Sequence, residues 1–249
     1  MSLRLFTPEP LAEHAELSLP PGPARHAQVR RVQPGDTLWL FDGRGADWPA
    51  TVLAMGKSEV RVRVGTPVVV QRELPVAVTL ALAMPANERM DTLVEKATEL
   101  GVATLQPLHT ERSVLRLAGE RATKKQAHWQ AIAQAACEQC GRATVPEVAP
   151  VLNLQFWLAT QRGTPPTGPR LLLSLRDGAA PAAQLAAGHH RTLHTLSGPE
   201  GGFTPDEEVA ALAAGYLATD LGPRVLRAET APLAVLAWLA LHTTACPGG

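Results

Sequence analysis

The run VAVTLALAM, residues 76–84, carries a single polar side chain, Thr79. A strand this apolar is typical of a sheet covered by helices on both faces. The next segment, residues 90–101, places apolar side chains at helical spacing and ends in a glycine, so a helix is predicted there. Apolar strand segments and helical segments alternate along the rest of the chain, which predicts a mainly parallel α/β sheet. The further strands are expected at 103–110, 170–175, 191–198 and within 216–226, and the further helices at 124–140, 205–214 and 230–242.

Residues 1–72 have a different pattern. Short alternating or β-branched segments (RLF, DTLWLFDG, WPATVLAM, SEVRVRVG) are separated by the turn sequences PGD, DGRG and MGKS, without a helical pattern. This spacing predicts a small β-barrel, which serves either as a packing domain or as a module that docks a nucleic-acid substrate. Two domains are therefore expected, 1–72 and 73–249.

Charge and hydropathy exclude some classes of protein. The formal net charge is zero, so a general nucleic-acid binder is not indicated, and any RNA contact depends on local basic clusters. Such clusters are more often solvated faces than binding sites. The start of the chain lacks a signal-peptide pattern, and the apolar stretch 231–242 is too short to span a bilayer. A cytoplasmic protein without a membrane partner is expected. The basic clusters are Arg25, Arg30 and Arg31, and Arg112, Arg116, Arg121, Lys124 and Lys125.

The chain has three cysteines, two of which, Cys137 and Cys140, form a C-x-x-C. A redox pair of this kind lies at a helix N-terminus, where the helix dipole lowers the thiol pKa. Here the pair ends a predicted helix. A zinc site would need two further ligands, and no second pair with suitable spacing exists. A structural role and no metal are therefore predicted.

In parallel α/β sheets, ligands bind at the carboxyl ends of the strands. Three loops are expected there: LRDGA after 170–175, SGPEGGF after 191–197 and LGPRVLRAET after 216–221. The glycines of the second loop expose backbone amides that a Cβ would shield. The sequence Thr204-Pro205-Asp206-Glu207 then predicts a capping box at the start of a helix.

The glycine-rich loop does not match a phosphate-binding motif. It lacks the lysine of a Walker A sequence and the G-x-G-x-x-G order of a dinucleotide fingerprint. Glu200, Asp206 and Glu207 place negative charge where a phosphate would add more. S-adenosylmethionine, which carries a sulfonium and an ammonium but no phosphate, suits these charges better. A tight turn without a ligand remains the alternative.

The third loop brings Arg224, Arg227 and Glu229 close to the same expected pocket. Crowded charges before an apolar helix are costly to leave unpaired. They form either a structural arginine–glutamate pair or part of a catalytic site. The helix at 230–242 has no clear polar face, so packing against a second copy of the chain is also expected.

Several motifs together resemble one family. They are GPEGGF, LGPRVLRAETA, ELGV (99–102), TERSV (110–114), EQCGR (138–142), VPEV (145–148) and FDGRG (41–45). The chain resembles the bacterial 16S rRNA uridine-N3 methyltransferases (the RsmE family), which belong to the SPOUT class. The resemblance covers nearly the whole chain. It departs from the family at Ala86-Asn87, where a lysine and a glycine are usual, and at Arg25, where a histidine is usual.

The resemblance implies a PUA-like β-barrel followed by a SPOUT domain with a trefoil knot, an exception to the rule against threaded chains. It also implies a homodimer that uses S-adenosylmethionine to methylate N3 of a uridine in 16S rRNA or the small ribosomal subunit. The implied cofactor-binding residues are Leu175, Leu196, Gly198, Pro199, Glu200, Gly201, Gly202, Leu221, Gly222, Val225 and Leu226. The RNA-binding candidates are Arg25, Arg30, Arg31, Arg89, Arg112 and Arg142.

Uracil N3–H is about as weak an acid as a tyrosine phenol, so methyl transfer to N3 needs a base or a stabilising cation. Arg227 is predicted to stabilise the developing negative charge. Glu229 or Glu200 is predicted to accept the proton or to hold the arginine. The alternatives are a SPOUT methyltransferase acting on another RNA position and a non-catalytic assembly factor, and the intact GPEGG and LGPRVLR motifs argue against the second.

Overall fold

The computed structural model describes residues 1–249 except 1–2, 58, 87, 164–166, 186–189 and 243–249. The chain divides into two compact units, of which the first comprises Met1–Glu73 and Gln134–Val145 and the second Leu74–Ala133 and Pro146–Gly249. A second domain running without interruption from residue 73 was expected. In the structure, the segment Gln134–Val145 belongs instead to the first unit. Asn87, one of the departures from the family pattern, lies outside the described residues.

The first unit is built on a six-stranded sheet with the order β1-β3-β4-β5-β2, in which β6 also pairs with β4. All of its pairings are antiparallel except that of β1 with β3. In β5, three buried valines alternate with two exposed arginines, which is the pattern of a strand with one buried face and one solvent-exposed face. The elements are β1 (Arg4–Phe6), β2 (Glu16–Ser18), α1 (Pro21–Val29), β3 (Thr37–Phe41), β4 (Ala46–Met55), β5 (Val60–Val64) and β6 (Val68–Val69).

Helix α1 corrects the sequence prediction, which found no helical pattern in this part of the chain. The helix begins with a proline in its first turn, where the missing N–H costs nothing. Its buried face consists of Ala24 and Ala27 alone. Two alanines give a hydrophobic periodicity too weak to recognise, because most of the helix surface faces solvent.

Segment Gln134–Val145 belongs to the first unit because strand β1 binds to it. The Arg4 guanidinium donates to the carbonyl oxygens of Cys137 at 2.5 Å and Arg142 at 2.8 Å, and forms an ion pair with Asp47 at 2.7 Å. The Glu138 carboxylate accepts from the backbone N–H of β1 at 2.8 Å. This segment therefore completes the hydrogen bonding of an outer strand of the sheet.

The second unit contains an eight-stranded sheet with the order β10-β8-β7-β13-β11-β14-β12, in which β9 also pairs with β8. Every pairing is parallel, which confirms the predicted α/β class. No helix within the described ranges is long and apolar enough to cross a membrane. The elements are β7 (Ala77–Ala83), α2 (Glu88–Glu99), β8 (Thr104–His109), α3 (Gly119–Cys140, ending in the first unit), β9 (Glu147–Val148), β10 (Leu152–Asn153), α4 (Leu154–Arg162), β11 (Arg170–Leu173), β12 (Ala180–Pro181), α5 (Ala182–Leu185), β13 (Thr192–Ser197), α6 (Pro205–Ala213), β14 (Leu217–Asp220) and α7 (Thr230–His242).

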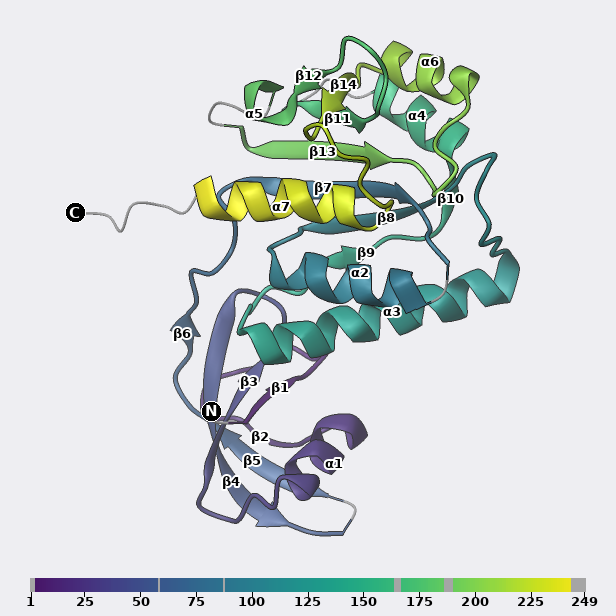
Figure 1. The fold of residues 1–249 in the computed structure, drawn as a ribbon. Helices are drawn as coiled ribbons and strands as arrows, with labels where there is room; N and C mark the ends of the chain where they lie inside the picture. Colours follow the sequence, from purple (N-terminus) through teal and green to yellow (C-terminus); the bar gives the residue numbers. More distant parts are fainter. Residues whose placement is uncertain (1–2, 58, 87, 164–166, 186–189, 243–249) are drawn as a thin grey trace, which may run out of the picture. The chain divides into compact units, whose positions relative to one another are not determined.

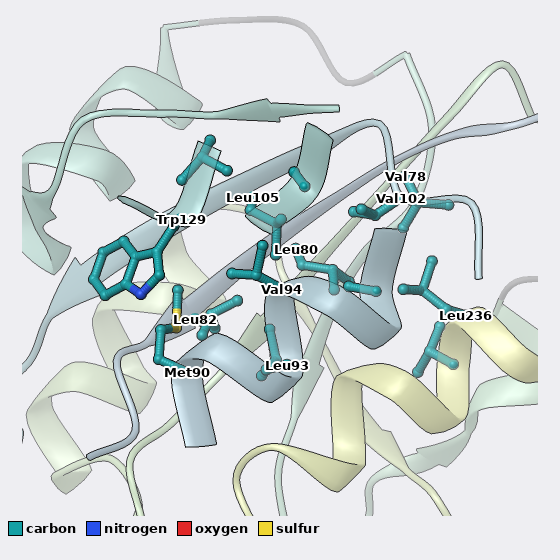
Figure 2. Packing of buried hydrophobic residues seen from close by; sticks show 14 of the residues in the cluster. Val78, Leu80, Leu82, Met90, Leu93, Val94, Val102, Leu105, Trp129 and Leu236 are labelled. Atoms are coloured by element: carbon teal, nitrogen blue, oxygen red, sulfur yellow. The ribbon is translucent and has the colours of Figure 1, made fainter. Parts of the chain in front are cut away.

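Helices cover both faces of this sheet (Figure 1). Alternate residues of β7 point to opposite faces: Leu80 and Leu82 belong to the core under α2 and α7, and Ala81 to the core under α4 and α6. Figure 2 shows side chains of α2 and Leu236 of α7 meeting the strand residues in the larger core. This two-sided burial explains why β7 is almost wholly apolar.

Helix α4 was not predicted from the sequence, which has a proline- and glycine-rich segment, residues 163–169, directly after it. Asn153 caps the helix by accepting from the Phe156 N–H at 2.7 Å. Leu154, Leu158 and Gln161 are buried at helical spacing. The cap and this spacing are the signals that could have identified the helix.

Helix α7 offers a matched test of the core. Leu236 is 0% exposed and Leu241, on the same helix, is 77% exposed. We expect Leu236→Ala to lower the free energy of unfolding by about 2–5 kcal/mol, because it leaves a cavity in the larger core. In a monomer, where nothing covers Leu241, Leu241→Ala should change the free energy of unfolding by less than about 0.5 kcal/mol. Urea unfolding measures both, and an equal loss for Leu241→Ala would show that a second copy of the chain covers this end of α7.

Candidate functional site

The carboxyl ends of three neighbouring strands form one edge of a cavity. Leu173, the last residue of β11, is in register with Ser197 of β13 and with Thr219 of β14. The loops that follow these strands therefore start side by side, as the parallel topology predicts. They enclose a cavity of about 620 Å³, a volume typical of sites for small organic ligands.

Two glycines of the GPEGGF loop are favoured for different reasons. A Cβ on Gly198 would lie 3.2 Å from both the Cδ2 and the backbone nitrogen of Phe203, so a side chain there would require Phe203 to shift by a few tenths of an ångström. Gly202 has a φ of +67°, in the left-handed region, and donates its N–H to the Pro199 carbonyl at 2.8 Å. The result is a compact turn that brings backbone against the cavity.

The predicted capping box is confirmed. The Thr204 hydroxyl accepts from the Glu207 N–H at 3.2 Å, and the Glu207 carboxylate accepts from the Thr204 N–H at 2.9 Å. The other Glu207 oxygen accepts from the Glu111 N–H at 2.8 Å. Glu207, 6% exposed, is thus occupied by backbone donors, and neither it nor Asp206 lines the cavity. Asp206 and Glu207 were expected to place negative charge at the ligand site, and that prediction is wrong.

The acidic side chains that do line the cavity are Glu200 and Glu208. Arg89 forms an ion pair with Glu200 at 3.1 Å. The Ser174 hydroxyl donates to Glu208 at 2.8 Å, and Arg176 lies 4.0 Å from the same carboxylate. Arg224 and Arg227 also line the cavity, so its wall carries both signs of charge, which suits a ligand that itself carries both.

Ser197 adds a polar group that the sequence prediction missed. It lines the cavity and is 3% exposed, and its hydroxyl has no hydrogen-bond partner among the residues that the structure describes. A buried hydroxyl without a partner costs roughly 1–3 kcal/mol. A polar ligand atom in the cavity would remove that cost.

Most of the predicted cofactor-binding residues line this cavity. Leu196 is buried in the core under α4 and α6, because it points to the opposite face of β13 from Ser197. At Gly201 the Cβ direction leads toward the Arg112 side chain, at 3.5 Å. Neither of these two residues is among those that line the cavity. The predicted residues that do line it are Leu175, Gly198, Pro199, Glu200, Gly202, Leu221, Gly222, Val225 and Leu226, together with Arg227.

Two of the three predicted catalytic residues line the cavity and the third does not. Arg227 and Glu200 line the cavity, and the Arg227 carbonyl accepts from the N–H groups of Thr230 and Ala231 at the start of α7. Glu229 is not among the lining residues. One of its carboxylate oxygens is buried and has no partner among the described residues.

The six predicted RNA-binding arginines have different environments. Arg25, Arg30 and Arg31 are exposed on the first unit. Arg89 and Arg112 hold the GPEGGF loop instead of extending freely, since Arg89 pairs with Glu200 and Arg112 donates to its carbonyls. Arg142 is 3% exposed and makes a bidentate ion pair with Glu73, so it is enclosed and does not face an RNA surface.

The two thiols of the C-x-x-C lie at the carboxyl end of α3, as the sequence predicted. The pKa of Cys140 is lowered to about 6, chiefly by the adjacent Cys137 thiol and to a smaller extent by Arg142, while burial opposes both. The interaction between the two thiols raises the pKa of Cys137. A purely structural role for the pair stays a prediction.

These features define a class: a parallel α/β protein with a ligand-sized cavity between glycine-containing loops at its strand ends, together with a small β unit. A family model described as RNA methyltransferase domain matches residues 72–240, and one described as RNA methyltransferase PUA domain matches residues 24–65. The chain belongs to this family of RNA methyltransferases.

Relatives and solved structures agree with this membership. Ribosomal RNA small subunit methyltransferase E of Synechocystis sp. is 35% identical, over 95% of this chain and 77% of the relative. The protein of the same name from Mycobacterium bovis is 33% identical, over 88% of this chain and 83% of the relative. The crystal structure of a ribosomal RNA small subunit methyltransferase E from Neisseria gonorrhoeae bound to S-adenosyl methionine is 36% identical, with a TM-score of 0.88, and the match covers 96% of this chain and 97% of that one.

The capping box allows a test of how firmly the loop is fixed. We expect Thr204→Ala to lower the free energy of unfolding by about 1 kcal/mol, because the Glu207 N–H loses its acceptor at the start of α6. Thr204→Ser keeps the hydroxyl and should retain most of the stability. Urea unfolding compares the two variants, and wild-type stability in Thr204→Ala would show that the cap contributes nothing.

Proposed function

We propose that the protein transfers the methyl group of S-adenosylmethionine to N3 of a uridine in the 16S RNA of the small ribosomal subunit. The observation that carries this is the cavity at the ends of β11, β13 and β14. The Neisseria gonorrhoeae structure, which matches this chain over nearly its whole length, has S-adenosyl methionine bound.

The residues of the cavity fit this cofactor. Gly198 and Gly202 let the ligand approach the backbone of the turn, and the Ser197 hydroxyl is a buried polar group in need of a partner. Apolar side chains that line the cavity, Leu221 and Leu226 among them, suit the flat face of an adenine ring. Carboxylates and guanidinium groups on the same wall suit the ammonium and carboxylate of the methionine part.

When bound, S-adenosylmethionine supplies an electrophilic methyl group on a sulfonium. The protein must then make uracil N3 nucleophilic at neutral pH, where N3 is protonated. Arg227 lines the cavity, and its guanidinium group is the candidate for stabilising negative charge that develops on a uracil oxygen. The target base must leave its stack to reach this position.

Two carboxylates are candidates for accepting the N3 proton. Glu200 lines the cavity, but its carboxylate is already engaged by the Arg89 guanidinium at 3.1 Å. Glu229 does not line the cavity, but one of its carboxylate oxygens is buried and has no hydrogen-bond partner in the described part of the chain. Either one could hold Arg227 in place.

The two units have separate proposed roles. The first unit, Met1–Glu73 with Gln134–Val145, is a PUA-like module that docks the RNA, and the exposed Arg25, Arg30 and Arg31 are its candidate phosphate contacts. The second unit, Leu74–Ala133 with Pro146–Gly249, is the SPOUT methyltransferase domain, whose cofactor loops are knotted. The protein acts as a homodimer in the cytoplasm, with the mostly apolar α7 as a candidate dimer contact.

Binding of S-adenosylhomocysteine tests the cofactor assignment. We expect calorimetry to show binding of S-adenosylhomocysteine but not of ATP or NAD. Gly198→Val should weaken binding at least about tenfold, because its side chain would collide with Phe203 and open the turn. Gly22→Val is the matched control, since a Cβ at Gly22 meets no atom within 4 Å. No binding by the folded wild-type protein would overturn the assignment and favour a non-catalytic RNA-binding factor.

Methyl transfer tests the role of Arg227. With the cofactor saturating, we expect Arg227→Ala to lower kcat on small-subunit RNA by about a hundredfold or more, the scale seen when one donor to a developing anion is removed. The affinity for S-adenosylhomocysteine should change far less. A rate equal to that of the wild type would show that Arg227 takes no part in the chemistry. Mass spectrometry of the modified nucleoside identifies the methylated position.

A further inference from the structure

A second loop holds the GPEGGF turn in place from outside the cavity. This loop, residues 110–118, follows β8, which is separated from β13 by β7 in the sheet. It nevertheless reaches the turn after β13, because the Arg112 side chain extends to it. One guanidinium nitrogen, Nη1, donates to the carbonyl oxygens of Gly201 at 2.8 Å and Phe203 at 3.3 Å.

Arg112 also packs against the turn. The position of a Cβ on Gly201 would lie 3.5 Å from the Arg112 Cδ and 3.6 Å from its Cβ, which is ordinary van der Waals contact. The aliphatic stem thus covers the outer side of the turn while the charged end binds its carbonyls. Gly201 belongs to this contact, which explains why it lies off the cavity.

The loop that carries Arg112 is itself fixed. The Thr110 N–H donates to the Ser113 hydroxyl at 2.9 Å, and both side chains are buried. The Glu111 N–H donates to Glu207, the residue that also closes the capping box of α6. Arg112 therefore projects from a rigid turn, so its reach to Gly201 is set by the backbone.

We propose that Arg112 is a positioning residue that holds the turn 198–203 in the conformation that binds the methyl donor. This inference rests on the proposed function of that turn. The cationic guanidinium makes charge-assisted hydrogen bonds to carbonyl oxygens, which are about twice as strong as neutral ones. The opposite side of the turn is held by the Arg89–Glu200 ion pair, so the turn is fixed from both sides.

The competing role is direct contact with RNA, which the sequence predicted for Arg112. Arg112 is exposed, which permits either role. Their energetic consequences differ. A phosphate contact contributes to RNA affinity and to its salt dependence, whereas a support of the turn contributes to affinity for the methyl donor.

Two variants of the full-length protein separate these roles. Arg112→Met keeps an aliphatic stem on Gly201 but removes the donors, and Arg112→Lys keeps a cationic donor. We expect Arg112→Met to raise the Kd for S-adenosylhomocysteine and the KM for S-adenosylmethionine by about tenfold, the loss expected for one charge-assisted hydrogen bond. Arg112→Lys should recover most of this loss. RNA affinity and its salt slope should stay within about twofold of the wild-type values.

Arg25→Ala is the matched control, because it removes a proposed RNA contact on the other unit. It should weaken RNA binding, lower the salt slope by about one and leave S-adenosylhomocysteine binding unchanged. If Arg112→Met behaves like Arg25→Ala, or weakens both ligands together, the positioning role is wrong. Wild-type binding of S-adenosylhomocysteine by Arg112→Met would also overturn it while leaving the proposed function intact. Only a failure of the wild-type protein to bind S-adenosylhomocysteine would count against the proposed function itself.

Discussion

The parallel register of β13, β11 and β14 is the constraint on which the site depends. Backbone hydrogen bonds align Leu173, Ser197 and Thr219, so three loops from distant parts of the sequence begin at one place. The register is strongly specified because both faces of the sheet are buried, and a shift by one residue would turn every core side chain to the wrong face. The cavity is thus a consequence of the same burial that stabilises the fold.

Hydrogen bonds between charged side chains and the backbone stabilise the loops around the site. Glu207 accepts two backbone N–H groups from separate loops, and Arg112 donates to two carbonyls of the glycine-rich turn. Glycine-rich turns have high conformational entropy, so they keep one shape only where neighbouring groups restrain them. Such external restraints allow the turn to expose its backbone to a ligand and still remain ordered.

The sequence predicted the parts of the fold that have strong local signals. β7 and α7 were predicted from continuous apolar runs and the start of α6 from the capping box at Thr204, and the structure agrees with all three. Helix α1 was missed because its buried face is two alanines. Most of the cofactor-binding residues expected from the motifs line the cavity, but Ser197 was not among them, because a lone serine in a strand gives no signal until its burial is known. The role of Arg112 likewise depends on a contact across the sheet that spacing cannot reveal.

Helix α3 has a consequence for how such a chain can be inherited. Its first residues belong to the second unit, and its last turn, with the residues that follow, carries the partners of Arg4 and Phe6 in the first. A fragment ending at residue 72 would leave the Arg4 guanidinium and a β1 N–H without those acceptors. Two separate stretches of the gene therefore encode the amino-terminal unit. Recombination that transferred only the first stretch would not transfer the complete unit. Exchange between related proteins would have to move both stretches, or neither.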